Sequence, residues 1–268
     1  MESLRLASLW YAQGDVQQAW QTLQAAEHRA AVDATSFWRT YADLAWTQQK
    51  TRESVHASDL MINNGTATEA DYQRMLELYS ESDPQRAYRY ARLGWQRLHN
   101  PLFWYAVADT GLRSGKAREL VELLKKMGAD ERAVLARDPR AWMAIAQIYR
   151  ATGNQGGSLL AARVAARLAP SDPELLSAYL WLLVDMKQVA ELRPLVRDWE
   201  GRIGVLPELR EPMVAAMVLL GDTPRALRHY HVLLPQRQQD PAWLASFADV
   251  LEQSGNIERS EERRVGKE

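Results

Sequence analysis

The chain has 268 residues, of which 47% are hydrophobic, so it is long enough to bury a large core. Its 33 basic and 34 acidic residues leave a formal net charge of -1, which gives no overall field to gather nucleic acid or an anionic membrane. Cysteine is absent, which excludes disulfides, thiolate zinc sites and cysteine nucleophiles and leaves the redox compartment undetermined. The longest apolar run, residues 175–184, is far shorter than the roughly 20 residues that span a bilayer, so we expect a core helix there and no transmembrane segment.

The N-terminal stretch, residues 1–15, lacks the basic region, apolar stretch and small-residue cleavage site of a secretory signal. Leu6, Trp10 and Gly14 instead fit a helical pattern that recurs further along the chain. We therefore expect the chain to begin inside a repeat and the native protein to continue in both directions.

One stretch, residues 138–173, serves as the unit of that pattern. It predicts two helices and a turn, since apolar residues recur at helical spacing, a Gly-Asn pair interrupts them, and prolines close the unit. The residues are Trp142, Ile145, Ala146 and Tyr149, then Gly153 and Asn154, then 159–169, then Pro170 and Pro173.

The same unit recurs with a period of about 34 residues. Its expected starts are separated by 33, 33, 38, 34, 34 and 34 residues, and the turn glycines Gly115, Gly153, Gly221 and Gly255 give the same period. The starts after the first, at residue 1, lie near Thr35, Thr68, Pro101, Pro139, Pro173, Pro207 and Pro241.

This period and this residue pattern resemble the tetratricopeptide repeat family. The central unit matches with Trp142 in the large aromatic slot, Ala146 at the helix contact, Ala165 as the small residue and Pro170 at the end. The resemblance implies an all-α fold, a right-handed superhelical α-solenoid of about 7.5 repeats over residues 1–258. It also implies an interaction scaffold.

Three features depart from the repeat pattern. Ser54 and Ser58 stand where the second helix of the second repeat should be apolar, which predicts weaker packing. Pro194 falls inside a second helix starting near Ala190, where it should kink the helix or delay its start. The fourth repeat carries four extra residues within 127–139, which predict a longer loop or an added helical turn.

Capping and the C-terminus give two further expectations. Asp83 before Pro84 is the N-cap arrangement that should start a second helix. The eighth repeat supplies one helix, residues 242–253, before Gly255. The charged residues 259–268 are expected to form a disordered, solvated tail, and they resemble a translated adaptor rather than native coding sequence.

No motif in the sequence carries catalytic chemistry. There is no phosphate-binding loop and no nucleophile elbow, and the glycines at 153, 156 and 157 fit an inter-helix turn. His229 and His231, two residues apart, would lie on different faces of a helix, which disfavours a shared metal. Asn64 is formally a glycosylation acceptor, but a turn is favoured there. We expect no catalytic residue, cofactor or metal, and hence no enzyme.

The side chains that carry function should lie on the concave face of the first helices. Trp10, Trp38, Trp104 and Trp142 occupy core slots, where burial between helices explains them without a ligand. The remaining mixture of rings, arginines and acids suits either a sugar chain or an extended peptide, and an ordinary mixed-polarity surface is an equal alternative. The concave-face residues are Arg39, Asp43, Trp46, Tyr72, Tyr79, Tyr105, Asp109, Arg113, Arg140, Gln147, Arg150, Trp181 and Asp185.

The carboxylate clamp of chaperone-binding members of the tetratricopeptide family is absent. That clamp uses Lys and Asn side chains, whereas the matching slots here hold other residue types. A chaperone adaptor is thereby disfavoured. The slots hold Arg39, Asp43, Tyr105, Asp109, Met143 and Gln147.

The C-terminal half resembles a more specific group. Residues 177–199 and 211–256, with the motif LLGD-x-x-x-AL, are similar to the periplasmic repeat region of the PelB family, outer-membrane proteins of bacterial Pel exopolysaccharide export. The resemblance covers residues 84–256. It implies a scaffold in exopolysaccharide export and biofilm formation that recruits the polysaccharide deacetylase/hydrolase of that system, with the exopolysaccharide as a further ligand. It also implies the periplasm, with attachment to the outer membrane through parts outside this chain.

Two alternatives stay open. One is a general peptide-binding adaptor, in the cytoplasm or on a membrane complex. The other is a repeat arm that serves an enzyme in a longer chain. The sequence of the full-length protein would separate the three interpretations, because a β-barrel after residue 258 would exclude the adaptor and a catalytic domain would reveal the enzyme arm.

Overall fold

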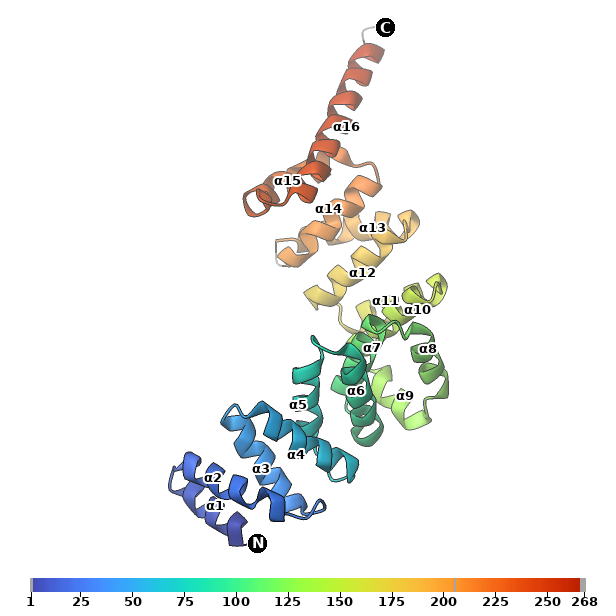
Figure 1. Cartoon of the computed structure of the whole chain (residues 1–268). Coiled ribbons are helices and arrows are strands. Elements are labelled where there is room, and N and C mark those ends of the chain that lie inside the picture. Colours follow the sequence, from blue (N-terminus) through green and yellow to red (C-terminus); the bar gives the residue numbers. More distant parts are fainter. Residues whose placement is uncertain (1, 205, 266–268) are drawn as a thin grey trace. The chain divides into compact units, whose positions relative to one another are not determined.

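The computed structural model describes residues 2–204 and 206–265, together with all of their side chains except those of 256–265. The described residues form α-helices and short 3₁₀ turns, and no strand is found among them. The fold is therefore all-α, an α-solenoid of paired helices (Figure 1). The chain divides into two compact units, Met1–Leu135 and Ala136–Glu268, and each is described by itself.

The first unit contains four helix pairs and one added helix. Short turns join the two helices of each pair, so each pair forms a hairpin (Figure 1). A 3₁₀ turn, Glu27–Arg29, follows the first pair. The pairs are α1 (Glu2–Ala12) with α2 (Val16–Ala26), α3 (Thr35–Thr47) with α4 (Thr51–Asn63), α5 (Glu69–Tyr79) with α6 (Pro84–Leu98), and α7 (Pro101–Arg113) with α8 (Ala117–Lys126), followed by α9 (Ala129–Ala136).

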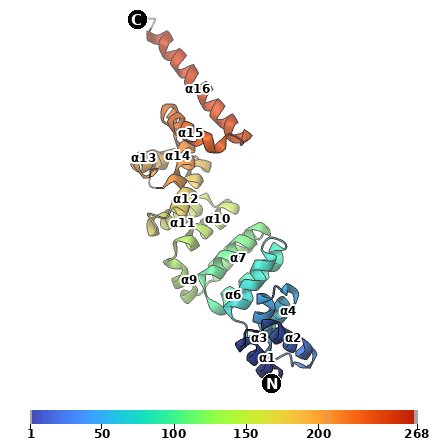
Figure 2. The ribbon, with the colours of Figure 1, turned by 90° about the vertical axis from the view of Figure 1, so that its left-hand side faces the viewer.

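The second unit contains three helix pairs and a long last helix, which projects past α15 in both views (Figures 1 and 2). Two 3₁₀ turns, Glu200–Arg202 and Pro207–Leu209, precede its third pair. The elements are α10 (Pro139–Ala151) with α11 (Gln155–Leu168), α12 (Pro173–Asp185) with α13 (Val189–Trp199), α14 (Arg210–Leu219) with α15 (Thr223–Arg237), and α16 (Pro241–Val265).

Aspartate caps followed by proline start several helices. As expected, Asp83 caps α6, and its carboxylate accepts a hydrogen bond from the Arg86 backbone N–H at 3.0 Å. Asp138 accepts from the Arg140 and Ala141 N–H groups at 2.9 and 3.2 Å at the start of α10. A proline at the first helical position gives up an N–H that has no intrahelical partner there. These caps fix where helices begin.

The turn inside most pairs has one geometry, in which a residue with positive φ stands two residues before the second helix. Glycine fills this place at Gly14, Gly115, Gly153 and Gly221, with φ from 71° to 83°. Gln49 and Lys187 fill it in two further pairs, with φ of 57° and 52°. The turn is thus a property of the helix pair, and glycine is its usual but not its obligatory residue.

The core lies between the helices and combines large rings with alanines. Trp104 is fully buried and its ring lies 5.9 Å from that of Trp95, while Tyr41 is fully buried against Trp20 at 4.9 Å. Alanines such as Ala146 are buried beside them, and the Ala146 carbonyl oxygen accepts a hydrogen bond from Ser158 of the neighbouring helix. Because the rings supply area and the alanines allow close approach, each pair buries its apolar face against its neighbours.

The expected weak packing at the serines is wrong. Ser54 and Ser58 are both fully buried, and each hydroxyl has a partner. Ser54 donates to the Ala42 carbonyl oxygen at 2.9 Å, and Ser58 donates to the Asp71 carboxylate at 3.0 Å. A buried hydroxyl that donates a hydrogen bond avoids most of the penalty of desolvation, so these positions are polar contacts between helices.

Two further expectations can be compared with the helices. The stretch that carries the extra residues of the fourth repeat contains α9, a helix of 8 residues, so the added helical turn is confirmed over the longer loop. Helix α13 begins at Val189 and includes Pro194, so the expected delay of its start is wrong. The helix continues because a proline removes only one hydrogen bond, here to the Ala190 carbonyl, and its neighbours can sustain the turn.

The last helix corrects two expectations at the C-terminus. A helix end at Gln253, with Gly255 as a turn glycine, is wrong, because α16 runs through Gly255 to Val265. The backbone of 259–265 is helical where a disordered tail was expected, and residues 266–268 lie outside the described residues. One glycine costs a helix only about 1 kcal/mol relative to alanine, and the Glu and Arg residues that follow favour helix.

Candidate interaction surface

The thirteen residues expected on a concave face occupy the first helices α3, α5, α7, α10 and α12. Their exposure differs. Arg39, Trp46, Tyr79 and Tyr105 are partly exposed, and Tyr72 is only 2% exposed. The expectation that Tyr72 lines a binding surface is therefore wrong, because its ring packs edge-on against Phe103 at 5.7 Å. The remaining eight, all exposed, are Asp43, Asp109, Arg113, Arg140, Gln147, Arg150, Trp181 and Asp185.

Arg74 joins Asp43 to Trp46. Its guanidinium pairs with the Asp43 carboxylate, and its central carbon lies 5.9 Å from the centre of the Trp46 ring. Arg74 also lies 3.5 Å from Asp71, which is buried. Sequence reasoning missed Arg74, because a residue in a helical core position gave no sign of contacts with the preceding first helix.

The arginines at 39 and 113 have structural partners. Arg39 donates to the Thr66 carbonyl oxygen at 2.8 Å. Arg113 donates to the Glu81 carboxylate at 2.9 Å, lies 3.5 Å from Asp109, and also donates to the Ser80 carbonyl oxygen. Each therefore ties its helix to a neighbouring turn, and neither guanidinium is fully available to a ligand.

The tyrosines of the first unit differ in the same way. Tyr79 stacks on Tyr90 of α6 with ring centres 6.0 Å apart, and the Arg86 guanidinium lies 4.4 Å from its ring. Its ring thus packs towards the second helix of its own pair. Tyr105, on α7, remains partly exposed. Deeper in the unit, burial and the neighbouring Glu27 carboxylate raise the pKa of the Tyr41 hydroxyl, which donates to Glu27 at 2.9 Å.

In the second unit, charged pairs connect α10 to α12. Arg150 and Asp185 form an ion pair at 2.6 Å, and Arg140 lies 3.8 Å from the Glu174 carboxylate. Gln147 and Trp181 are both exposed and stand six residues before their turn residues, Gly153 and Lys187. Equivalent positions in two successive first helices therefore present one amide and one indole ring.

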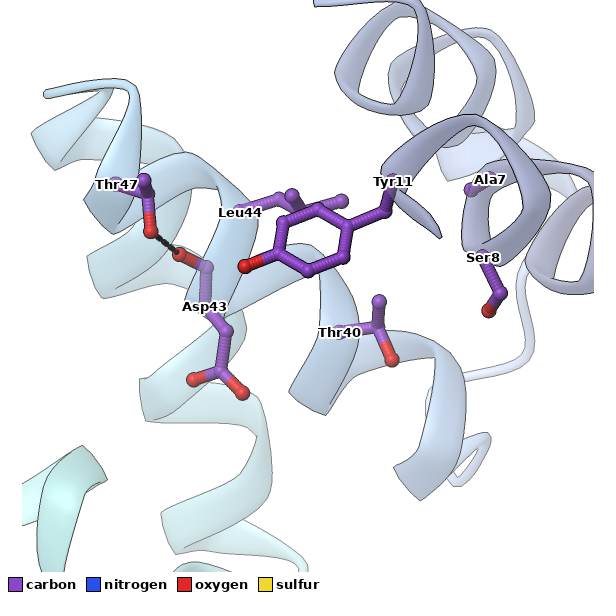
Figure 3. A pocket seen from close by; sticks show the side chains of 7 residues that line it. All are labelled: Ala7, Ser8, Tyr11, Thr40, Asp43, Leu44 and Thr47. Atoms are coloured by element: carbon purple, nitrogen blue, oxygen red, sulfur yellow. Dashed lines mark hydrogen bonds between the residues drawn. The ribbon is translucent and has the colours of Figure 1, made fainter. Parts of the chain in front are cut away.

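A hollow on the first helices lies between α1 and α3 and has a volume of about 270 Å³ (Figure 3). Tyr11 is 56% exposed, and its ring extends from α1 towards Asp43 and Leu44 on α3. Only Asp43 among its lining residues was expected at a binding surface. The other lining residues are Ala7, Ser8, Tyr11, Thr40, Leu44 and Thr47.

The serine and threonine hydroxyl groups of this pocket already donate their hydrogens to backbone carbonyls. Ser8 donates to Leu4 at 2.9 Å, Thr40 to Ser36 at 3.0 Å, and Thr47 to the Asp43 carbonyl oxygen at 2.9 Å, which Figure 3 marks. Their oxygens keep lone pairs, and the Asp43 carboxylate adds acceptor oxygens. The pocket consequently offers hydrogen-bond acceptors beside an aromatic ring, and it suits a ligand rich in N–H or O–H donors.

A sequence signal for this pocket exists in the turn register. Ser8 and Tyr11 stand six and three residues before Gly14, as Asp43 and Trp46 stand before Gln49. The turn glycines alone did not reveal this correspondence, because Gln49 rather than a glycine occupies the turn after Asp43 and Trp46.

The histidines and acidic residues of the described chain do not form a metal site. Among the described residues, no three His, Asp or Glu side chains are grouped so that they could bind a metal ion. His229 lies 3.6 Å from Glu200, while the His231 ring packs on Phe247 at 5.4 Å, so the two histidines have separate surroundings. No helix within the described ranges is long and apolar enough to cross a membrane.

Comparisons with known proteins agree with the repeat pattern. A family model described as Tetratricopeptide repeat matches residues 1–265. The curated proteins contain no significant match.

Solved structures give distant matches. A tetratricopeptide repeat protein from Parabacteroides merdae is 13% identical, with 93% of this chain and 98% of that chain covered and a TM-score of 0.45. An assembly chaperone of RpL4, Acl4, is 14% identical with 97% and 98% covered and a TM-score of 0.42. The P58(IPK) tetratricopeptide domain is 15% identical with 92% and 77% covered and a TM-score of 0.34.

Proposed function

Because the chain belongs to the tetratricopeptide repeat family, we propose that it is a non-catalytic scaffold whose first helices bind a protein partner. The observation that carries the proposal is the pocket between α1 and α3, where acceptor oxygens surround the exposed ring of Tyr11. An extended peptide complements this pocket, since its backbone N–H groups can donate to the acceptor oxygens and its side chains can pack on the ring.

The charged pairs on the first helices support the same proposal. Arg74 pairs with Asp43, and Arg150 pairs with Asp185, so these side chains are ordered before any partner binds. Ordered side chains lose less conformational entropy on binding, which favours affinity. In the second unit, the exposed Gln147 and Trp181 would offer contacts of their own.

We propose further that the partner belongs to bacterial exopolysaccharide export of the Pel type. This part rests on the resemblance of residues 84–256 to the periplasmic repeats of the PelB family. The expected partner is the polysaccharide deacetylase/hydrolase of that system, the expected location is the periplasm at the outer membrane, and the polymer itself is a second ligand.

Calorimetric titration of the 268-residue chain with the purified deacetylase/hydrolase, and separately with the polymer, tests the proposal. Tyr11→Ala and Asp43→Asn should each weaken binding by about 1–3 kcal/mol, because rings and charged groups at a pocket dominate such interfaces. Leu160→Ala is the control, since Leu160 is 61% exposed on α11 and does not line the α1/α3 pocket. Wild-type affinity in both pocket variants would exclude the α1/α3 pocket, and no binding of either ligand would exclude the export assignment.

A further inference from the structure

A second hollow lies in the second unit, on the side of the second helices, and has a volume of about 490 Å³. Arg163 and Arg167 reach it from α11, Tyr179 from α12, and Leu195 and Trp199 from α13. None of these residues belongs to the surface described above, so this pocket offers a separate place for a ligand.

Glu191, which also lines the pocket, is fully engaged. Arg163 donates to both of its carboxylate oxygens, at 2.8 and 2.5 Å, and the Tyr179 hydroxyl donates to one of them. These donors hold the pKa of Glu191 below its usual range, with Arg163 as the main cause. Burial is the main cause of the raised pKa of Tyr179, which keeps its hydroxyl protonated as a donor. The Glu191 carboxylate therefore stays ionised, and the charge of Arg163 balances it, so it does not attract a cation.

Trp199 forms a fixed apolar wall. Its ring centre lies 6.5 Å from that of Tyr179, and the Arg202 guanidinium lies 5.4 Å from it. Arg202 is itself held, because it donates to the Pro170 carbonyl oxygen at 3.0 Å. The indole remains partly exposed, and Leu195 extends the apolar surface. A ring fixed in this way offers a flat contact at little entropic cost.

Arg167 gives the pocket its charge. It is exposed and forms no hydrogen bond or ion pair within the described ranges, and its charge acts on Glu191 only at longer range. With Arg163 neutralised by Glu191, the Arg167 guanidinium leaves the pocket with one net positive charge. A guanidinium binds a carboxylate through parallel N–H groups.

We propose that this pocket binds an acidic side chain of a protein partner, with a neighbouring apolar side chain of that partner packed on Trp199. The positive charge of Arg167 selects the acid, and the Leu195 and Trp199 wall favours an apolar side chain over a hydrated sugar. The inference rests on the proposed role as a protein scaffold, and it adds a second docking point with its own selectivity.

The experiment uses the 268-residue chain and short fluorescein-labelled peptides. The probes are GLDFG, its neutral counterpart GLNFG and its basic counterpart GLKFG, and binding is measured by fluorescence anisotropy. GLDFG should bind about tenfold more tightly than GLNFG, as for one charge-assisted hydrogen-bonded pair. Arg167→Glu should reverse the preference, so that GLKFG binds that variant better than GLDFG. Trp199→Ala should weaken all three peptides.

The matched control is Arg118→Glu, which changes an exposed arginine on α8 that has no partner within the described ranges. It should keep the wild-type preference. Equal binding of GLDFG and GLNFG by the wild-type chain, or equal effects of the Arg167 and Arg118 variants, would overturn the proposal. Tighter binding of tri-galacturonate than of GLDFG would overturn it in favour of an acidic saccharide. Failure here and failure at the α1/α3 pocket are distinguishable, because this test reads a reversal of charge preference at Arg167 with short peptides, whereas the other reads Tyr11 and Asp43 with the purified deacetylase/hydrolase and the polymer.

Discussion

The Ser54 hydroxyl donates a hydrogen bond to the Ala42 carbonyl oxygen at 2.9 Å, and both residues are fully buried between α3 and α4. Ser158 and Ala146 repeat the contact at 2.8 Å between α10 and α11. Both serines lie twelve residues after their alanine. A hydroxyl at this position thus joins the two helices of a pair.

The two serines of the second repeat should differ in what their removal costs. Ser54→Ala should cost about 0.5–1.5 kcal/mol, because the Ala42 carbonyl keeps its helical partner. Ser58→Ala should cost more, about 1–3 kcal/mol, because it removes a donor from the Asp71 carboxylate, which is only 2% exposed. Hydrogen exchange of α3 to α5 measures both, and Ser158→Ala serves as the control for the repeated contact. Equal costs at Ser54 and Ser58 would contradict the account.

Tryptophans in equivalent repeat positions should contribute unequally. Trp104 is fully buried, so Trp104→Ala should cost about 3–5 kcal/mol through lost transfer energy and a cavity. Trp142 is partly exposed, with its indole N–H donating to the Ala136 carbonyl oxygen at 2.9 Å, so Trp142→Ala should cost only about 1–2 kcal/mol. The expectation that Trp142 is a core residue is therefore wrong.

Urea unfolding followed by hydrogen exchange in each helix pair measures these costs. Trp104→Phe is the matched control, because the buried Trp104 Nε1 has no hydrogen-bond partner among the described residues and a phenyl ring keeps most of the packing. It should cost less than about 1.5 kcal/mol. A loss at Trp142 as large as at Trp104 would show that exposure does not decide the difference.

The repeat period predicted where most of the first helices start but little of the surface. Pro101, Pro139 and Pro173 begin helices where the period places them. The period says which residues are equivalent, but it does not say what each contacts. Trp142 differs from Trp104 because inserted residues precede it in the chain, and Tyr72 is buried because Phe103, of the next first helix, packs against it. Such contacts depend on side chains far apart in sequence.

The pocket between α1 and α3 could not be predicted for a related reason. It needs two first helices at a particular distance, and that distance is set by core residues rather than by the residues that line the pocket. Arg74, which orders Asp43, looks in sequence like any other residue of α5.

Alkaline pH should destabilise the first unit through Tyr88. Burial, followed by the nearby Glu119 carboxylate, raises the pKa of Tyr88 to about 12. The stability that this shift contributes is fully present below the unfolded pKa of about 10 and is lost as pH rises through 12, because the unfolded chain ionises first. We expect a loss of about 2–3 kcal/mol over this window. Denaturant unfolding at pH 9 to 12 measures it, and Tyr88→Phe should flatten the profile.

The Arg150 and Asp185 ion pair should matter for binding and not for folding. Both side chains are substantially exposed, 53% and 43%, so water and salt screen the pair. Arg150→Ala should cost less than about 1 kcal/mol of stability, and Tyr105→Ala should likewise cost little. Thermal melts and titration with the candidate partner measure both quantities. If the two variants melted at a much lower temperature, or if both bound the partner with wild-type affinity, Arg150 and Tyr105 would not belong to the proposed surface.

The turn residues should respond to substitution in opposite directions. Gly153 has φ of +78° and Lys187 has φ of +52°, a region that is free for glycine and strained for residues with a Cβ. Gly153→Ala should cost about 1 kcal/mol through backbone strain alone, because a Cβ there would meet no atom within 4 Å. Lys187→Gly should instead stabilise the α12 and α13 pair by about 0.5–1 kcal/mol, since relief of strain exceeds the added entropy of the unfolded chain. Gln49→Gly tests the same stabilising effect at a turn of the first unit. The urea concentration at the midpoint of unfolding measures the effect of each substitution. If Gly153→Ala stabilised the protein, or if Lys187→Gly and Gln49→Gly both destabilised it, packing rather than the positive φ would govern these turns.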